Sequence, residues 1–445
     1  MILSEAATVE EKGQIATKVV MINDVARAFF EAVATRTICV EIPEEAKDEE
    51  DEEEDNVAIL MKSLYGTRDA AANFQKEIRG FMSRLGFETG KYNVSTFYHR
   101  SRKMMTMVHG DDFVTVCERE DAKWFKKALE ERFEIKTKIL GDGKDESQEE
   151  TVLNRVVRRT SEGWECEADS RHAEIIVKAM KMEEANTVVT PGENDKEWKI
   201  QEEDVELPRE QVTEYRALAA RANYLAMDRV DIQYAVKEIC RGMSKPTVGD
   251  RRKLKRLARY LAGRPRVVTE YQWQERTPEV WGFSDNDWAG CRKTSRSTSG
   301  GLLMKGTHFL KAWSSTQKSV TLSSAEAELV AAVKTAVEII GVTQLAYDWG
   351  HTWKGHVYVD SSAALGIAHR KGNGRLRHVK VGMSWLQERT EEGELKLKKV
   401  SGENNPADVL TKNVVQEKLV KFTKMVGQRF LEGKAKKALD VAGWG

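Results

Sequence analysis

The last third of the chain has an ordered alternation of strand-like and helix-like segments, and this constrains the fold more than any other part of the sequence. Short β-prone runs come first, followed by a long apolar helical segment, a strand, two helical segments and a last strand. This order predicts an α/β arrangement with a mixed sheet of five strands and helices packed on it. The strand-like segments are 279–285, 300–305, 308–313, 356–360 and 394–400, and the helix-like segments are 323–340, 361–370 and 378–391.

Acidic residues stand at the ends of these strands and near the starts of the helices. Taken singly, such an Asp can begin a turn or cap a helix. If the strands that end at Asp285 and Asp360 pair in one sheet, their carboxylates lie side by side, and a crossing helix adds Glu328. Asp408, near the start of a further helix, is a fourth candidate. Carboxylates that converge without basic partners indicate divalent cations such as Mg²⁺ or Mn²⁺, which can activate water for attack on a phosphodiester.

Residues 104–116, MMTMVHGDDFVTV, predict a β-hairpin with two adjacent carboxylates at its tip. Like charges side by side repel, so Asp111 and Asp112 form either a plain polar turn or a site for a cation. Asp24 follows a buried strand predicted at 16–22 and adds a third carboxylate. The three residues together favour a metal site over a turn.

Between these regions the chain is predicted to be mainly helical. A linker-like break at 141–150 precedes a short strand pair at 151–167, and the segment 251–266 is strongly basic on one helical face. That face either follows a nucleic-acid backbone or is solvated. The acidic run 44–56 predicts a solvated loop, and residues 416–445 predict a Lys-rich tail with little periodic structure. Further helices are predicted at 68–86, 119–133, 170–183, 213–243 and 250–262.

The composition bounds the class of protein without identifying a partner. The 445 residues predict two or three domains, and Lys+Arg and Asp+Glu are equal at 71 each. The five cysteines are dispersed and show no CxxC spacing, which argues against a disulfide scaffold and a structural zinc site and favours a reducing, intracellular compartment. No signal peptide is recognisable and no apolar run approaches the roughly 20 residues of a membrane span, so a soluble protein without a membrane partner is expected.

Five segments of the last third resemble the ribonuclease H domain of Ty1/copia-type retrotransposon polyproteins. They are SDNDWAG, RSTSGG, AWSSTQKSVTLSSAEAEL, VDSSAAL and NPADVLTK. The resemblance implies a ribonuclease H-like fold with a metal-binding quartet. Asp287 and Glu326 are near alternatives for two of its positions, but the preferred first Asp follows its strand directly, and the preferred Glu precedes the family's apolar run. The quartet implied is Asp285, Glu328, Asp360 and Asp408.

The front of the chain resembles the reverse transcriptase of the same polyproteins. NDVARAFFEA is similar to the first catalytic motif, HGDD to the second, and KSLYGTRDAAANF to the segment that abuts template and nucleotide. By this resemblance Asp24 and Asp111 hold two metal ions around the incoming triphosphate and the primer 3′-oxygen, and Asp112 is the second Asp of its motif. The nucleotide-binding residues implied are Phe29, whose ring would exclude a 2′-hydroxyl, Gly66, where the backbone can approach nucleic acid, and Arg68, a phosphate contact.

The resemblance covers about residues 15–415 and implies a multidomain chain of α+β and α/β type. The domains implied are a truncated polymerase palm at 1–140, a helical thumb and connection at 141–275, a ribonuclease H-like domain at 276–415 and a basic tail at 416–445. The activity implied is RNA-directed DNA polymerisation with ribonuclease H cleavage, using Mg²⁺ or Mn²⁺ with two ions in each active site. The partners implied are an RNA template, a DNA primer, RNA–DNA hybrid and deoxynucleoside triphosphates. The locations implied are the cytoplasm, within a retrotransposon particle, and the nucleus.

The polymerase half departs from the family pattern, and alternatives stay open. Asp24 lies only 23 residues after Met1, so the fingers that should precede it are expected to be missing. Phe29 and the basic helix also have structural interpretations, as a core side chain and a solvated face. The alternative functions are a degenerate fragment with ribonuclease H activity alone, or a non-catalytic nucleic-acid-binding remnant.

Overall fold

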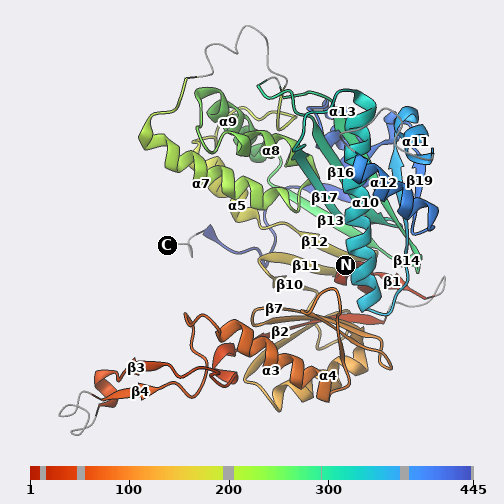
Figure 1. Ribbon diagram of the computed structural model, residues 1–445. Helices are drawn as coiled ribbons and strands as arrows, with labels where there is room; N and C mark the ends of the chain where they lie inside the picture. The colour runs from red at the N-terminus through yellow and green to blue at the C-terminus, as the bar shows by residue number, and fades with distance from the viewer. Residues whose placement is uncertain (11–16, 48–55, 194–204, 292, 371–379, 442–445) are drawn as a thin grey trace.

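The fold is built on three principal sheets of six, five and five strands, with helices packed around them (Figure 1). The predicted mixture of helices and sheets is therefore confirmed. This computed structural model describes residues 1–10, 17–47, 56–193, 205–291, 293–370 and 380–441.

The first sheet is antiparallel and contains the predicted hairpin. Both of its faces are buried because β8 carries two apolar sets that alternate along the strand. Phe113 and Cys117 share a core with helices α3 (Ala70–Arg84) and α4 (Arg119–Glu130), whereas Val114 belongs to the core on the other face. The strand order is β5 (Glu88–Thr89), β6 (Thr96–His99), β7 (Met104–His109), β8 (Asp112–Glu118), β2 (Lys18–Val25) and β9 (Ile135–Leu140).

The second sheet joins the middle of the chain to its C-terminal part. The strand pair predicted at 151–167 is three strands in the structure. The expected tail at 416–445 is wrong as a description of the structure, because helix α13 (Gln416–Met425) buries Leu419 and Phe422 one turn apart and is followed by a strand of this sheet. The strand order, antiparallel throughout, is β10 (Glu149–Val152), β11 (Arg155–Thr160), β12 (Gly163–Glu167), β13 (Arg266–Gln272) and β20 (Gln428–Leu431).

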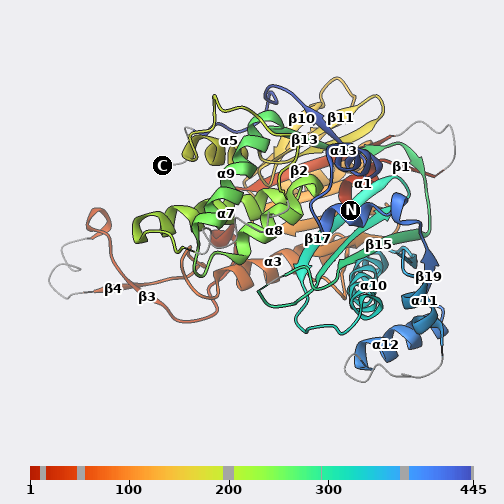
Figure 2. The ribbon, with the colours of Figure 1, turned by 90° about the horizontal axis from the view of Figure 1, so that it is seen from above.

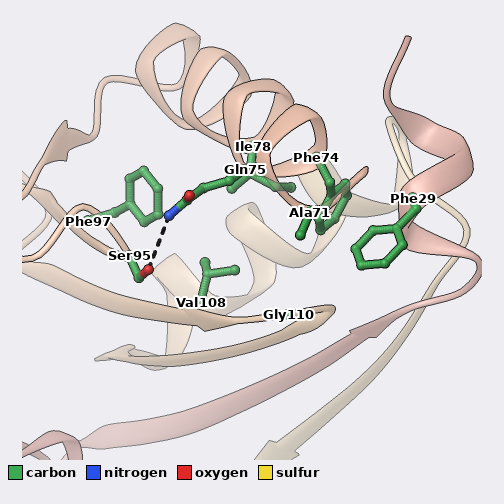
Figure 3. Close-up of a pocket in the computed structure, with 9 residues that line it drawn as sticks. All are labelled: Phe29, Ala71, Phe74, Gln75, Ile78, Ser95, Phe97, Val108 and Gly110. Carbon is green, nitrogen blue, oxygen red and sulfur yellow. Dashed lines mark hydrogen bonds between the residues drawn. The ribbon is translucent and has the colours of Figure 1, made fainter. Parts of the chain in front are cut away.

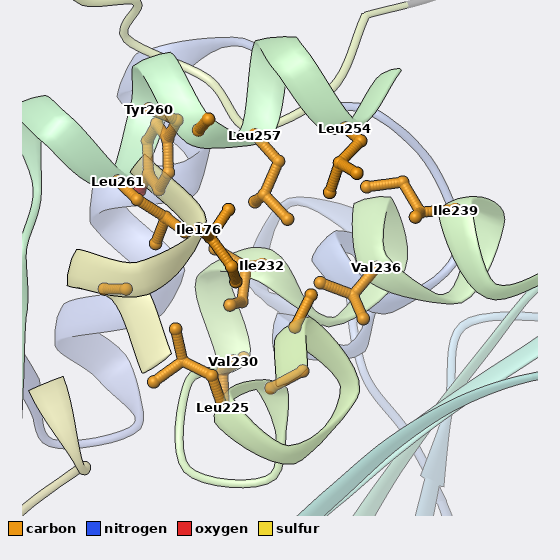
Figure 4. Close-up of a cluster of buried hydrophobic side chains, with 14 of the residues drawn as sticks. Ile176, Leu225, Val230, Ile232, Val236, Ile239, Leu254, Leu257, Tyr260 and Leu261 are labelled. Atoms are coloured by element: carbon orange, nitrogen blue, oxygen red, sulfur yellow. The ribbon is translucent and has the colours of Figure 1, made fainter. Parts of the chain in front are cut away.

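A group of helices shares the apolar core shown in Figure 4. The single helix predicted at 213–243 is two α-helices separated by the 3-10 turn η4 (Val230–Ile232). The break is held by Arg229, which is fully buried and lies 2.7 Å from the carboxylate of Asp231. Tyr260 donates a hydrogen bond to the same carboxylate at 2.9 Å. The helices of this group are α5 (Ser170–Ala179), α7 (Arg209–Ala226), α8 (Gln233–Arg241) and α9 (Val248–Gly263).

The third sheet lies in the last third of the chain and is mixed. Strand β15 pairs antiparallel with β16 and parallel with β18. Helix α10 (Ser324–Asp348) packs on it, with α11 (Ser362–His369) and α12 (Lys380–Glu391) beyond (Figure 2). Gly282 allows this close approach, since a Cβ there would lie 2.6 Å from Thr335 of α10. The strand order is β17 (His308–Thr316), β16 (Thr298–Lys305), β15 (Glu279–Asp287), β18 (Lys354–Val359) and β19 (Leu395–Lys399).

Helix α10 also reaches the first sheet. At its C-terminal end the carboxylate of Asp348 accepts hydrogen bonds from the backbone N–H groups of Lys91, Tyr92 and Asn93 at 2.8–3.3 Å. By length and composition α10 is apolar enough to cross a membrane, which the sequence pattern did not indicate. Because it covers the mixed sheet and shares its core, packing within the protein accounts for part of that apolar content.

The N-terminal helix contributes a buried carboxylate to the junction between the sheets. Glu5 lies 2.8 Å from Lys18 of β2 and 2.5 Å from Arg276. Burial raises the pKa of Glu5, but Lys18, Arg276 and Lys305 outweigh it and lower the pKa to about 2. Glu5 is therefore ionised and holds several cations around it.

The remaining elements are short. The hairpin of β3 and β4 projects away from the first sheet in both views (Figures 1 and 2). It flanks the acidic run predicted as a solvated loop, most of which lies outside the described residues. The short elements are α1 (Ile2–Ala6), β1 (Thr8–Val9), η1 (Ala28–Glu31), β3 (Cys39–Glu41), η2 (Glu44–Ala46), β4 (Val57–Ile59), β14 (Gln274–Glu275), η5 (Gly402–Asn404) and η6 (Pro406–Leu410).

Candidate active sites

Three of the predicted acidic residues meet at one edge of the mixed sheet. Strands β15 and β18 are parallel neighbours, and Phe283 pairs with Tyr358 in their register. Asp285 and Asp360 each follow that pair by two residues, so both carboxylates reach the same edge. Helix α10 brings Glu328 to this place, and ligand oxygens of Asp285, Glu328 and Asp360 all lie within 4.8 Å of one another. These three residues are called the acidic triad below.

Two residues of the acidic triad are buried, Asp360 is half-buried, and the three carboxylates repel one another. Asp285 is 4% exposed and Glu328 is 2% exposed. Burial, with the charges of Asp285 and Asp360, raises the pKa of Glu328 to about 8. Burial also raises the pKa of Asp285 to about 7, against a hydrogen bond from Thr411. Among the described residues no hydrogen-bond partner reaches Oε1 of Glu328, although this oxygen is buried. An unpartnered buried oxygen beside two further carboxylates fits a divalent metal ion.

Neutral side chains hold the triad in place. Asn286 donates to Oε2 of Glu328, and the hydroxyl of Thr411 donates to Oδ2 of Asp285. Asn405 donates to the third triad carboxylate at 3.5 Å. Amide and hydroxyl donors orient a carboxylate without neutralising it, so the triad keeps the negative charge that a cation needs. The sequence reasoning missed these donors, and only the adjacency of Asn286 to the predicted Asp285 signalled one of them.

The fourth predicted ligand, Asp408, is not part of the triad. Its Oδ1 lies 2.5 Å from Nζ of Lys412, and its Oδ2 pairs with Nζ of Lys418. Asp408 is still near enough for its charge to raise the pKa of Asp285. Burial lowers the pKa of Lys412, but the carboxylates of Asp408, Asp285 and Asp360 raise it overall. The sequence reasoning missed both lysines, although Lys412 follows Asp408 by one helical turn.

The two alternative acidic residues have other surroundings. Asp287 is half-buried two residues further along β15, and burial raises its pKa while Lys237 and Lys412 lower it. Glu326 lies in the first turn of α10 and accepts a hydrogen bond from the backbone N–H of Leu322 at 2.7 Å. This contact makes Glu326 part of the helix start. The geometry therefore favours Asp285 and Glu328, because their carboxylate oxygens gather with those of Asp360 within 4.8 Å.

The second group of predicted carboxylates lies at the tip of the β7–β8 hairpin. Gly110 and Asp111 form a two-residue turn in which Gly110 has a φ of +64°, and His109 pairs with Asp112 across it. Asp24 is the partner of Asp112 in the neighbouring strand β2. Burial, with the charges of Asp111 and Asp24, raises the pKa of Asp112, whereas Asp24 and Asp111 are exposed. In the described part of the chain these three do not form a group as tight as the acidic triad.

A cavity of about 210 Å³ lies beside this hairpin tip (Figure 3). Phe29 and Gly110 both line it, with residues of α3 between them. Phe29 also packs against Tyr65, with ring centroids 4.4 Å apart, so it is at once a packing side chain and a cavity wall. Gly66 has a φ of +89°, a side chain there would meet open space, and Arg68 is exposed. Their roles toward a nucleotide stay predictions.

The predicted basic helix is α9, and part of its charge is used within the chain. Arg256 lies 3.0 Å from the carboxylate of Glu193. Arg259 donates to the backbone carbonyl of Asn186 at 2.7 Å. These contacts favour a structural role for the two arginines, and contact of this helix with nucleic acid stays a prediction.

Known proteins are similar to this chain along most of its length. Residues 10–194 match the family described as reverse transcriptase (RNA-dependent DNA polymerase). The retrovirus-related Pol polyprotein from transposon RE2 of Arabidopsis thaliana is 27% identical over 410 residues, which are 91% of this chain and 27% of that protein. The polyprotein from transposon TNT 1-94 of Nicotiana tabacum is 25% identical over 381 residues, 83% of this chain and 28% of that protein. The chain resembles Ty1/copia-type Pol polyproteins.

This finding confirms the resemblance predicted from the motifs. The chain spans only 27–28% of the length of these relatives. Among solved structures, the foamy viral protease-reverse transcriptase in complex with RNA/DNA hybrid aligns with a TM-score of 0.50 and 12% identity, over 90% of this chain and 45% of that chain. At that identity the alignment shows a shared fold. The chain therefore contains a retrotransposon-type reverse transcriptase region within a fold similar to that of a known reverse transcriptase.

Proposed function

We propose that this chain is the reverse transcriptase and ribonuclease H portion of a Ty1/copia-type polyprotein, and that it hydrolyses the RNA strand of an RNA–DNA hybrid. The observation that carries the proposal is the acidic triad, three carboxylates within 4.8 Å, of which one buried oxygen has no hydrogen-bond partner among the described residues. In the layout proposed, the first sheet belongs to a polymerase palm, and the mixed sheet belongs to a ribonuclease H-like domain. The helices α5, α7, α8 and α9, whose shared core is drawn in Figure 4, belong to a thumb and connection.

Asp285, Glu328 and Asp360 would hold Mg²⁺ or Mn²⁺, which when bound activates water and stabilises the leaving oxygen of a phosphodiester. The chain itself orients the carboxylates. Thr411 occupies one oxygen of Asp285, and Asn286 occupies one oxygen of Glu328. Because each donor takes a single oxygen, the other oxygen of each carboxylate is left for a cation.

Cleavage of a hybrid tests the proposal directly. Purified protein with Mg²⁺ or Mn²⁺ is expected to cut the RNA strand, and Asp360→Asn is expected to abolish cutting. Asp440→Asn is the matched control, since Asp440 is exposed and pairs with Lys434 near the C-terminus. Absence of cleavage by wild type with both metals, or equal cleavage by Asp360→Asn, would show the proposal to be wrong.

We propose RNA-directed DNA polymerisation as a second activity, at the hairpin tip. Two observations support it. Asp24 pairs with Asp112 across neighbouring strands beside Asp111 of the turn, and Phe29 lines the adjoining cavity. The substrates proposed are an RNA template, a DNA primer and deoxynucleoside triphosphates. Because these carboxylates are less closely gathered than the triad, primer extension by this chain is expected to be weak or absent. Robust extension on an RNA template would contradict that expectation.

The comparison with solved structures supports the proposed nucleic-acid partner. The foamy viral protein was solved with an RNA/DNA hybrid, which supports a hybrid as the partner here. The free thiols of all five cysteines are compatible with the intracellular location proposed. The alternative of ribonuclease H activity alone is favoured because, among the described residues, the carboxylates of the acidic triad lie closer together than those at the hairpin tip. A non-catalytic remnant would bind a hybrid without cutting it.

A further inference from the structure

We propose that Lys412 and Lys418 keep Asp408 out of the acidic triad, so that the protein without nucleic acid binds one divalent ion, and that a nucleic-acid phosphate releases Asp408 to complete a second metal site. This inference rests on the proposed ribonuclease H function. It concerns the order in which that site is assembled.

Asp408 is held by a pair of cations and by its own burial. Its side chain is 4% exposed, and each of its carboxylate oxygens lies against a lysine Nζ, that of Lys412 at 2.5 Å. Thr411, the neighbour of Lys412, bonds both to Asp285 of the triad and to the backbone carbonyl of Asp408 at 3.1 Å. Asp408 is thus beside the triad but electrically satisfied without a metal ion.

In the described part of the chain the triad lacks partners of the kind that Asp408 has, and this distinguishes its three carboxylates from the fourth residue of the predicted quartet. Glu328 is 2% exposed, and its Oε1 has no hydrogen-bond partner among the described residues. With a metal ion bound, the three ionised carboxylates carry about three negative charges, which one divalent ion largely neutralises. A second ion beside the first needs further negative charge. Asp408 could supply that charge, but Lys412 and Lys418 neutralise it. We therefore expect the protein without nucleic acid to bind one divalent ion.

The two lysines are suited to exchange one anion for another. The Lys412 side chain is 47% exposed and that of Lys418 is 34% exposed, so both reach solvent above the buried carboxylate. A lysine ammonium is a compact charge on a flexible stem and binds phosphate as a point charge. A phosphodiester that enters beside the triad would compete with Asp408 for both ammonium groups. The negative charge of Asp408 is then no longer neutralised by the two lysines at the moment when the substrate is present.

The experiment counts Mn²⁺ ions bound per chain, from the electron paramagnetic resonance signal of free Mn²⁺, with folded protein and no nucleic acid. Wild type is expected to bind one tightly held ion. Lys412→Met combined with Lys418→Met is expected to bind two, with the single variants as further tests should the double variant not fold. Lys421→Met is the matched control and is expected to bind one, because Lys421 lies on the same helix α13 as Lys418 and bonds to Glu403 and Asn404 instead.

The outcomes separate this inference from the proposed function. If wild type cleaves a hybrid yet binds two Mn²⁺ ions without nucleic acid, the inference is overturned and the proposed function stands. The same holds if every folded lysine variant still binds one ion. If Asp360→Asn cleaves as well as wild type, the proposed function falls and the inference falls with it.

Discussion

Two buried glutamates in this protein have opposite electrostatic surroundings. Glu5, at the junction between the sheets, contacts Lys18 and Arg276, and its pKa is lowered to about 2. Glu328, in the acidic triad, faces Asp285 and Asp360, and its pKa is raised to about 8. Both are buried, so burial does not distinguish them; the sign of the neighbouring charges does.

The difference separates a carboxylate that holds the fold together from one that is kept for a ligand. A buried carboxylate with its own cations is complete when the chain is folded. A buried carboxylate among other carboxylates destabilises the metal-free protein, and a cation from outside the chain relieves that cost. The comparison therefore predicts that the two glutamates respond in opposite ways to substitution, pH and metal.

The largest effect is expected from Glu328→Gln. Loss of this carboxylate should lower hybrid cleavage by about a thousandfold, since a bound metal ion supplies several kcal/mol of charge stabilisation. The same change should raise the melting temperature measured in EDTA at about pH 9, where Glu328 is ionised, because one member of a repelling group is then neutralised. Cleavage at the wild-type rate, or a lower melting temperature in EDTA at that pH, would contradict the assignment of Glu328 to a metal site.

Glu5→Gln is expected to destabilise the protein by about 3–5 kcal/mol, because it leaves buried cations without their partner. Chemical denaturation measures this loss. Glu10→Gln is the matched control: Glu10 also pairs with Arg276, at 2.9 Å, but its side chain is 44% exposed, so a loss below about 1 kcal/mol is expected. Equal losses in the two variants would show that the burial of Glu5 is unimportant.

Stability is expected to depend on pH with opposite signs at the two glutamates. The lowered pKa of Glu5 contributes stability above the unfolded value of about 4.3, and this stability is lost as the pH falls through about 2. The pKa values of Asp285 and Glu328 are raised to about 7 and 8, so their contribution is present below about pH 4 and is lost as the pH rises through those values. The melting temperature in EDTA should therefore fall between about pH 5 and pH 8, and Mg²⁺ should remove the fall. A flat profile in EDTA would contradict the assignment.

The smallest effect on stability is expected at the hairpin tip. Asp111→Asn changes an exposed side chain in a turn and should alter the free energy of unfolding by no more than about 0.5 kcal/mol. Any primer extension on an RNA template should disappear in the same variant. A large change in stability would indicate that these carboxylates interact as strongly as those of the triad.

Local pattern predicted the elements whose residues alternate or repeat clearly. The turn of the hairpin follows from Gly110 and Asp111, and the triad follows from Asp285 and Asp360 at strand ends. Strand β13 (Arg266–Gln272) and strand β20 (Gln428–Leu431) were missed because each is partly polar and is stabilised by pairing with a segment far away in the sequence.

Long-range pairing also explains what the sequence did not reveal about the sites. The break in the helix predicted at 213–243 depends on Arg229, a residue that favours helices but is buried here against Asp231. Likewise, the lysines on Asp408 look like ordinary surface charges in the sequence. Lys418 comes from a different helix, α13, so only the folded chain shows that it contacts this carboxylate.

Helix α10 carries Glu328 near its start and Asp348 at its end, about 30 Å apart at 1.5 Å per residue. Glu328 forms part of the triad. The carboxylate of Asp348 accepts hydrogen bonds from the backbone N–H groups of Lys91, Tyr92 and Asn93 beside the first sheet. A continuous helix bends little over that distance. The first and third sheets are thus joined by one continuous helix, and a tilt of the first sheet would displace Glu328, a proposed metal ligand, at the other end of that helix.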